Sequence, residues 1–211
     1  MVRFEVSRDG HMMNDESVNE LFLSYKESLI KSLNSIDLKA LDKLISEIES
    51  MSKSGATLYI LGNGGSAATA SHFVNDLFSL KRKYQSFNLN AESLTDNISI
   101  VTALGNDIDF DDIFSEQLSV KMKAGDALLV LSASGNSTNL VKACSWAREN
   151  GFKVFSILGF DGGKVLDLSH TSLHLKTEQG EYERAEDLHL FVNHFIRLYF
   201  QNSLKDHGPS L

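Results

Sequence analysis

The sequence predicts an α/β fold in which a parallel sheet is covered by helices on both faces. Three short apolar runs have the pattern of buried strands, and a turn rich in glycine or serine follows each one; the runs are Thr57–Leu61, Ala127–Leu131 and Lys153–Leu158. Helical stretches alternate with these runs, which implies right-handed crossovers between parallel strands. The only proline, Pro209, lies near the C-terminus, so glycine is the residue that interrupts helices elsewhere.

Two amphipathic helices are expected before the first strand. The first begins at Val18, because apolar residues recur at spacings of three and four and Ser17 with Glu20 fits a capping box. The second has its apolar stripe over Leu38–Met51, and Gly55 stands where a C-terminal glycine cap belongs. Both helices therefore precede the sheet in the chain.

The remaining elements follow the loops in chain order. One helix is expected over residues 67–80 and another before Gly151, each after a glycine- or serine-rich loop. Weaker patterns predict strands near Phe87–Leu89 and Leu173–Leu175, and helices over Asn97–Leu104, Asp112–Lys121 and Glu183–Ser203. No linker or repeat divides the chain, so we expect a single domain over residues 12–205. A disordered or non-native segment is expected at residues 1–11, and a tail at 206–211.

The charge and cysteine content exclude several classes of partner. Twenty basic against 28 acidic residues give a formal charge of -8 and a pI near 5.3, which predicts no nucleic-acid partner and no anionic membrane surface. The single cysteine, Cys144, cannot form an internal disulfide, and no apolar run approaches the ~20 residues that cross a bilayer. We therefore expect a cytoplasmic protein.

Two loops at the ends of predicted strands, Gly62–Ser66 and Ser132–Ser137, have the composition of anion sites. Such a loop entering a helix exposes backbone N–H groups at the positive end of the helix dipole. The side chains that can add donors are Asn63, Ser66, Ser132, Ser134 and Ser137. Either loop alone is equally well explained by ordinary N-caps, but two at the carboxyl ends of strands favour a bound ligand.

Two other phosphate-binding motifs fit less well. A P-loop nucleotidase is poorly supported, because no lysine follows the loop glycines in the required arrangement. Gly62–Ala67 satisfies the G-x-G-x-x-A dinucleotide pattern, but the Phe87–Asn90 segment ends in asparagine where that fold needs an acidic residue. No nucleotide cofactor is expected.

Four motifs, in their order and spacing, resemble those of a known family. They are Gly62-Asn63-Gly64-Gly65-Ser66, Gly105-Asn106-Asp107, Ser134-Gly135-Asn136-Ser137 and Asp161-Gly162-Gly163-Lys164. Together they look like the signatures of the sugar isomerase (SIS) domain, in its phosphoheptose isomerase branch, from about Val18 to Phe200. The resemblance implies a three-layer α-β-α sandwich with a five-stranded parallel sheet, the flavodoxin-like SIS fold. It also implies a homotetramer with active sites at subunit interfaces.

The resemblance further implies an aldose–ketose isomerase. Such an enzyme converts sedoheptulose 7-phosphate to D-glycero-D-manno-heptose 7-phosphate through an enediol, for nucleotide-activated heptose and surface polysaccharide synthesis. This chemistry needs a base near one carbon and an acid or electrophile at the oxygens. Alternatives are an isomerase of another sugar phosphate, or a non-catalytic SIS regulator that binds a phosphosugar or a replication-initiator protein. Those regulators tend to lose the histidine that this chain keeps as His194, which favours the enzyme.

Site residues are implied by the same resemblance. The substrate would be bound by Asn63, Gly64, Gly65, Ser66, Asn106, Asp107, Ser132, Ala133, Ser134, Ser137 and Glu186. A zinc ion would be held by His72, Asp76, Glu186 and His194, a set of nitrogen and oxygen ligands that suits zinc. The catalytic residues would be Asp76, Glu186 and His194. We expect Glu186 to act partly as base, His194 as proton shuttle and Asp76 as ligand or second acid.

Helical spacing bears on this set. His72 and Asp76 are four residues apart and so share a helix face. Glu186 lies about 80° around the last helix from His194, but its side chain is long. His189 turns away from His194, so we expect it to be structural. In the opposing interpretation, His72 makes only a local hydrogen bond and the acidic residues of the last helix form a solvated face.

The chain departs from the family's pattern at four places. Asp76 stands where the family usually has glutamate, Glu186 where it has glutamine, and Ala133 where threonine is common. Retracting a catalytic carboxylate by about 1 Å can cost on the order of a hundredfold in rate. An arginine that usually reaches a neighbouring subunit's phosphate is missing, and Lys81–Lys83 is the candidate replacement at a shifted register. These departures concern substrate handling more than the fold.

Overall fold

The structure, a computed structural model, describes residues 17–205, so the predictions for residues 1–11 and 206–211 lie outside the described residues. The chain divides into two units after Asn34. The described part of the first unit is α1 (Val18–Asn34), and the predicted capping box is present, because Ser17 N–H donates to Glu20 Oε2 at 2.9 Å. Whether both units act as the one domain predicted over residues 12–205 stays a prediction.

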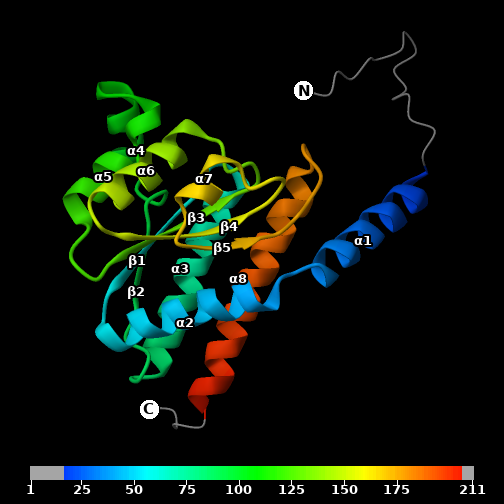
Figure 1. The fold of residues 1–211 in the computed structure, drawn as a ribbon, viewed down its shortest axis with the longest axis horizontal. Helices are drawn as coiled ribbons and strands as arrows, with labels where there is room; N and C mark the ends of the chain where they lie inside the picture. Colours follow the sequence, from blue (N-terminus) through cyan, green and yellow to red (C-terminus); the bar gives the residue numbers. More distant parts are fainter. Residues whose placement is uncertain (1–16, 206–211) are drawn as a thin grey trace. The chain divides into compact units, whose positions relative to one another are not determined.

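The second unit contains the predicted five-stranded parallel sheet. Its strands are β1 (Thr57–Leu61), β2 (Asn90–Ser93), β3 (Ala127–Ser132), β4 (Lys153–Leu158) and β5 (Thr171–His174). They pair in the order β2-β1-β3-β4-β5, and every neighbouring pair is parallel (Figure 1). This is the flavodoxin-like order, so the predicted fold class is confirmed.

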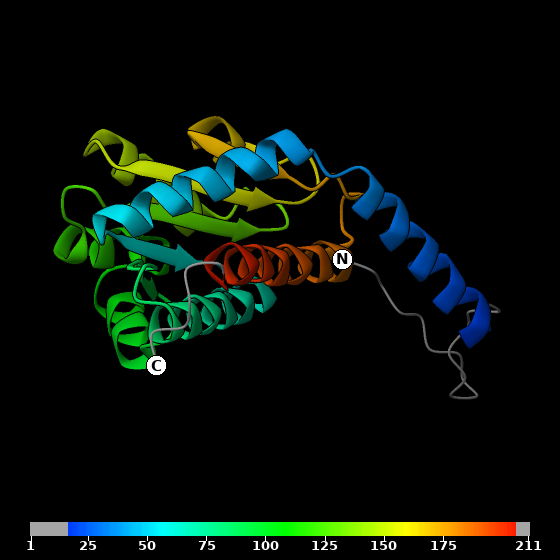
Figure 2. The same ribbon diagram turned by 90° about the horizontal axis from the view of Figure 1, so that it is seen from below.

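Helices cover both faces of the sheet. The elements are α2 (Leu38–Ser54), α3 (Gly65–Lys83), α4 (Ile98–Asp107), η1 (Phe110–Asp112), α5 (Ser115–Lys121), α6 (Thr138–Glu149), α7 (Gly163–Leu168) and α8 (Tyr182–Lys205). Figures 1 and 2 show α2, α3 and α8 against one face and α4 to α7 against the other. Side chains of β1 and β3 such as Leu61 and Val130 pack with Leu140 and Cys144 of α6 in one core cluster. Burial on both faces explains why these strands are almost continuously apolar.

Two parts of the sequence prediction need correction. The strand expected near Phe87–Leu89 lies instead at β2, just beyond it. Phe87 and Leu89 are buried, but as core residues of the segment before the strand. β2 is an edge strand in which only Ser93 is fully buried, so it carries almost no apolar signal. The short helix α7 was not predicted either, because it directly follows the Asp161–Gly163 turn and has only six residues.

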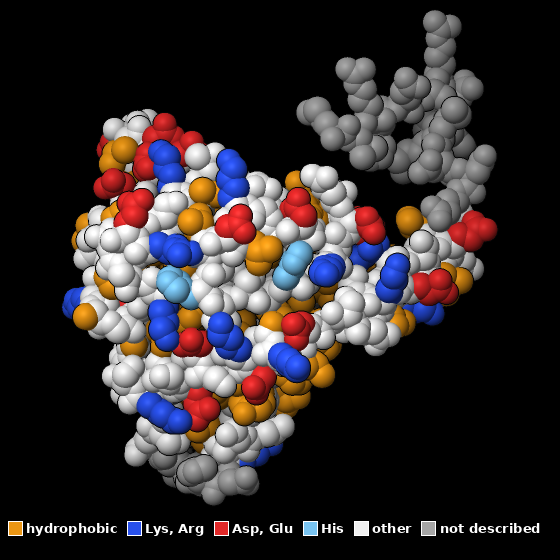
Figure 3. Space-filling model, in the orientation of Figure 1, with side chains coloured by type: hydrophobic (Ala, Val, Ile, Leu, Met, Phe, Trp, Pro, Cys, Tyr) orange, Lys and Arg blue, Asp and Glu red, His pale blue; other side chains and the backbone are white. Residues whose placement is uncertain are grey.

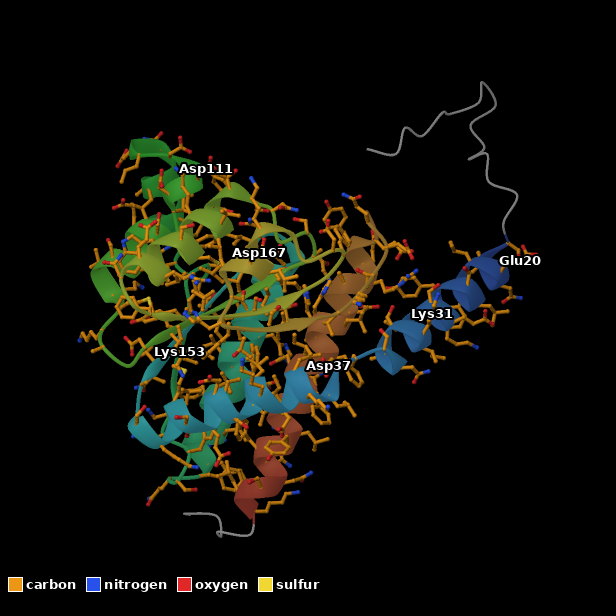
Figure 4. The ribbon with its side chains drawn as sticks, in the orientation of Figure 1. Glu20, Lys31, Asp37, Asp111, Lys153 and Asp167 are labelled. Atoms are coloured by element: carbon orange, nitrogen blue, oxygen red, sulfur yellow. The ribbon has the colours of Figure 1, made fainter. Side chains whose placement is uncertain are left out.

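Local contacts fix both ends of α2 and its position beside the sheet. Asp37 Oδ1 accepts a hydrogen bond from Lys39 N–H at 2.8 Å and so caps α2. Gly55 ends the same helix in the left-handed conformation, as predicted. Lys153, which begins β4 and is labelled in Figure 4, forms an ion pair of 2.6 Å with Glu47 on α2. The second helix is thus tied to the start of a central strand.

The surface carries charges of both signs. On the face shown in Figure 3, lysine and arginine side chains alternate with aspartate and glutamate, without a large single-sign patch. Within residues 17–205, no helix has the length and apolar character needed to span a membrane.

Candidate active site

The two predicted loops lie at the point where the strand order reverses. β1 and β3 are neighbours in the sheet, while β2 lies on the far side of β1. The chain therefore leaves β1 and β3 toward opposite faces, and open α/β sheets bind their ligands at such a point, outside the carboxyl ends of the strands. α3 begins at Gly65 and α6 at Thr138, so the N-terminus of each helix follows one of these strands. Both helix dipoles thus favour an anion at the same edge of the sheet.

The second loop is locked against the turn that follows β4. Gly135 has φ +61, and a Cβ there would lie 2.0 Å from the carbonyl oxygen of Gly162. Val165 N–H donates to Gly135 O at 3.0 Å, and Lys164 N–H donates to the Asn136 side chain at 3.1 Å. The loop can approach this turn so closely only because residue 135 has no side chain.

The three predicted serines of this loop differ in their contacts. Ser132 is buried, and its Oγ accepts a hydrogen bond of 2.9 Å from Gly135 N–H. Ser134 Oγ accepts one of 3.3 Å from Asn136 N–H. Ser137 is the N-cap of α6 but makes no side-chain cap hydrogen bond. Ser137 is therefore the serine whose hydroxyl is best placed to serve a ligand at the start of α6.

The first loop is tied to α6 by a pair of amides. Asn63 Nδ2 donates to Asn139 Oδ1 at 2.9 Å, and Asn139 Nδ2 donates back to Asn63 Oδ1 at 3.0 Å. The Asn63 side chain, predicted to contact the sugar, is thus already engaged in positioning its own loop. Sequence reasoning missed Asn139, although its place two residues after Ser137, in the first turn of a helix, was a usable signal.

The residue that follows β3, Ala133, packs against the start of α8. Ala133 is buried and packs with Phe160 and Ala185. Phe160 has φ +43, a conformation unusual for a residue with a side chain, and Thr177 Oγ1 and His174 Nε2 bond to its N–H and carbonyl oxygen. Because the Ala133 side chain is buried in this cluster, the substrate contact predicted for this residue would come from its backbone.

Glu186 lies against the start of α3. A Cβ built on Gly65 would fall 2.1 Å from Glu186 Oε2, so the carboxylate occupies the space that the missing side chain of Gly65 leaves. Burial raises the pKa of Glu186, and the nearby carboxylates of Glu183 and Asp187 raise it further. A carboxyl group of raised pKa, close to a loop that suits an anion, has the properties of a general base.

The packing of α3 against α8 brings three of the four predicted metal ligands together. His72, Asp76 and His194 each offer one ligand atom within 4.8 Å of the others. The Nε2 atoms of the two histidines are 3.0 Å apart, and Asp76 Oδ2 is 3.6 Å from His72 Nε2. Glu186 is not in this cluster, because its carboxylate lies at Gly65, seven residues before His72 on α3.

This donor set fits zinc. Zn–N bonds of about 2.0–2.1 Å in a tetrahedral site place two histidine nitrogens roughly 3.3 Å apart, close to the spacing of His72 and His194. The buried Asp76 carboxylate supplies an oxygen beside them. His72 and His194 are both exposed, so an ion can reach the site from solvent.

Asp76 has two further partners that sequence reasoning missed. Asn193 Nδ2 donates to Asp76 Oδ2 at 3.2 Å, and Arg197 Nε lies 3.3 Å from Asp76 Oδ1. A signal was present, because Asn193 interrupts the apolar stripe formed by Val192 and Ile196 on α8. A polar residue within a buried stripe points to a buried polar contact.

His189 is fully buried, which agrees with the structural role expected for it. Neither of its ring nitrogens has a hydrogen-bond partner among the described residues. Burial lowers the pKa of His189 to about 4, so the ring is neutral at pH 7.

No described contact brings the other predicted residues next to the two loops. Asn106 and Asp107 end α4, are exposed, and hydrogen-bond to each other at 2.8 Å. Lys81–Lys83 forms the last turn of α3, at the end opposite Gly65, and Lys81 donates to Asn90. The basic run is thus about 24 Å or more from the first loop of its own chain.

Comparisons with known proteins identify the family and the fold of the chain. The SIS domain family matches residues 22–159. The phosphoheptose isomerase of Helicobacter pylori (strain HPAG1) is 35% identical over 187 residues, 87% of this chain and 94% of that protein. That of Citrifermentans bemidjiense is 38% identical over 160 residues, 74% and 80% of the two chains. The solved structure of the phosphoheptose isomerase GmhA from Neisseria gonorrhoeae aligns with a TM-score of 0.78 and 27% identity, covering 88% of this chain and 100% of that chain.

Proposed function

Because the chain belongs to the sugar isomerase (SIS) domain family, in its phosphoheptose isomerase branch, we propose that it converts sedoheptulose 7-phosphate to D-glycero-D-manno-heptose 7-phosphate. The observation that carries the proposal is the combination of two helix N-termini at the ends of the adjacent strands β1 and β3 with the Glu186 carboxylate at Gly65. The first feature suits a phosphate and the second suits a base, and an isomerase of a sugar phosphate needs both.

The phosphate is assigned to the second loop. Its donors are the Ser137 hydroxyl, the Ser134 hydroxyl and the backbone N–H groups at the start of α6. Ser132 supports this loop from below by bonding Gly135 N–H. Gly64 and Gly65 leave room for the sugar at the first loop, which Asn63 and Asn139 hold in place.

The proton transfer is assigned to Glu186. As a carboxylate, it removes a proton from C1 of the ketose, and the electron pair forms an enediolate across C1 and C2. The proton is returned at C2, and the hydroxyl proton of O1 moves to O2. O1 thereby becomes the aldehyde oxygen and O2 a hydroxyl, so atoms and charge balance. The raised pKa of Glu186 suits both halves of this transfer, because the group must accept and then release the proton.

A zinc ion is proposed at His72, Asp76 and His194, where it would polarise the hydroxyl and carbonyl oxygens of the sugar. The same family resemblance supports a homotetramer with active sites at subunit interfaces. Exposed apolar side chains on α8 and the exposed Asn106 and Asp107 fit such an assembly. We also propose a cytoplasmic location and a role in supplying nucleotide-activated heptose for surface polysaccharide synthesis.

The test is incubation of the purified protein with sedoheptulose 7-phosphate, with added zinc and with a chelator, followed by NMR of the products. We expect an aldoheptose 7-phosphate, formed faster with zinc. Fructose 6-phosphate and ribulose 5-phosphate serve as matched ketose substrates. No turnover of the heptulose under any metal condition would overturn the proposal, and faster turnover of a shorter ketose would change the substrate.

A further inference from the structure

We infer that Asn193 and Arg197 are positioning residues that hold the Asp76 carboxylate against the two histidines; this rests on the proposed zinc site of the isomerase. The two residues contact different oxygens of the same carboxylate. Asn193 Nδ2 is 3.2 Å from Oδ2, and Arg197 Nε is 3.3 Å from Oδ1. They come from α8, whereas Asp76 and His72 come from α3.

Asp76 needs such partners because its own torsions do not fix the carboxylate. The terminal torsion of an aspartate is broad, so the plane of the carboxylate turns easily unless donors hold it. With Arg197 on Oδ1 and Asn193 on Oδ2, rotation of the carboxylate breaks both contacts. Oδ2 is then the oxygen that remains directed at His72, 3.6 Å away.

The burial of Asn193 and Asp76 shows that their contact is not an incidental surface contact. Asn193 is 0% exposed and Asp76 is 7% exposed, so the hydrogen bond between them replaces water that both groups lose on folding. The Arg197 side chain is 35% exposed, and its outer end bonds Gln201 Oε1 at 3.1 Å. Arg197 therefore supplies a balancing positive charge to a buried carboxylate while its own position is fixed by a neighbour one turn along α8.

The contacts also explain how a short carboxylate reaches the site. Asp76 lies four residues after His72, so its side chain starts on the same face of α3. Donors on α8 draw its carboxylate toward that helix, which is where His194 lies. Groups that hydrogen-bond a metal's carboxylate ligand set its orientation, and losing one typically costs 10–100-fold in metal affinity or activity.

The experiment measures zinc affinity of metal-free protein by competition with a chromophoric chelator, in the absence of substrate. Asn193→Leu and Arg197→Gln are each expected to raise the zinc dissociation constant about 10–100-fold. Val192→Ala is the control, because Val192 is also buried on α8 but does not touch Asp76; it should lower thermal stability and leave zinc affinity within about twofold. Arg197→Lys should fall between Arg197→Gln and the wild type, since it keeps the charge and loses the Nε donor.

A double-mutant cycle separates positioning from mere stability. In an Asp76→Ala background, Asn193→Leu and Arg197→Gln should cause no further loss of zinc affinity, because the group they position is gone. Equal losses in both backgrounds, or unchanged zinc affinity in the single variants, would overturn the inference. Wild-type protein that binds no zinc would also overturn it, whereas zinc binding without turnover of sedoheptulose 7-phosphate would remove only the proposed function.

Discussion

Ser137 is the residue on which phosphate binding should depend most. The Ser137 hydroxyl makes no helix-cap hydrogen bond, so replacing Ser137 by alanine should weaken phosphate binding and leave the helix cap unchanged. A hydrogen bond to a charged group is worth about 1.5–3 kcal/mol, which predicts a rise in KM of roughly 10–100-fold. Lys81→Ala should change KM less than about twofold, because Lys81 bonds Asn90 at the far end of α3. Steady-state kinetics compares the two, and the reverse order would assign the phosphate to the basic run of a neighbouring subunit.

Glu186 makes a prediction about pH. A base works only when deprotonated, and the pKa of Glu186 is raised by burial, Glu183 and Asp187. The acid limb of kcat/KM should therefore lie above the range of an ordinary glutamate and shift to lower pH in Glu183→Gln. Glu149→Gln, on the exposed end of α6, should leave the limb in place.

Removing the Glu186 carboxylate measures how much the proposed base contributes to kcat. Glu186→Gln is expected to lower kcat by on the order of 10²–10⁴, the usual contribution of a general base. Full activity in this variant would show that Glu186 is not the base.

At the scale of helices and strands, the buried side of α8 carries a histidine that no described group bonds. His189 on α8 is 0% exposed, and burial lowers its pKa to about 4 from an ordinary 6.5. Because the unfolded chain binds this proton more readily, stability is complete above pH 6.5 and falls as the pH drops toward 4. The difference corresponds to on the order of 3 kcal/mol, lost progressively across that window.

Urea unfolding of wild type and His189→Leu at pH 7, 6, 5 and 4 tests this, with the protein concentration held constant because oligomers unfold in a concentration-dependent way. The free energy of unfolding of wild type should decline more steeply than that of the variant. Parallel curves would mean that the ring is hydrated or bonded in solution.

Most helices and both loops could be predicted from the sequence, but contacts between α3 and α8 could not. Amphipathic spacing located α2, α3 and α8, and the two loops after β1 and β3 followed from apolar runs that end in glycine or serine. The position of β2 was predicted wrongly, because an edge strand with one buried residue has no apolar pattern. The partners of Asp76 were not predicted, because Asn193 and Arg197 lie more than a hundred residues after it in the chain. They contact Asp76 only when α8 packs on α3. Family motifs named His72 and His194, but only the packing showed that Glu186 lies apart from them at Gly65.

For the whole molecule, the exposed apolar side of α8 bears on assembly. Phe191, Phe195, Leu198 and Tyr199 are between 39% and 50% exposed, and their spacing of four, three and one places them on one side of the helix. Figure 3 shows hydrophobic side chains gathered along the edge of the body near this helix. Contiguous exposed apolar surface of this kind is costly in a monomer and usually marks an interface.

If α8 forms a subunit interface, a charge placed there should break the proposed homotetramer. Burying a half-exposed apolar side chain contributes on the order of 1 kcal/mol, and a carboxylate in its place adds a desolvation cost on both sides of a symmetric contact. Phe195→Glu combined with Leu198→Glu should therefore lower the mass found by size-exclusion chromatography with light scattering, and reduce turnover with it if the active sites are shared. Val120→Glu is the control, since Val120 is 84% exposed on α5, and it should leave both mass and turnover unchanged. A tetramer that survives the double substitution would place the interface elsewhere, and a monomeric, fully active wild type would exclude shared active sites.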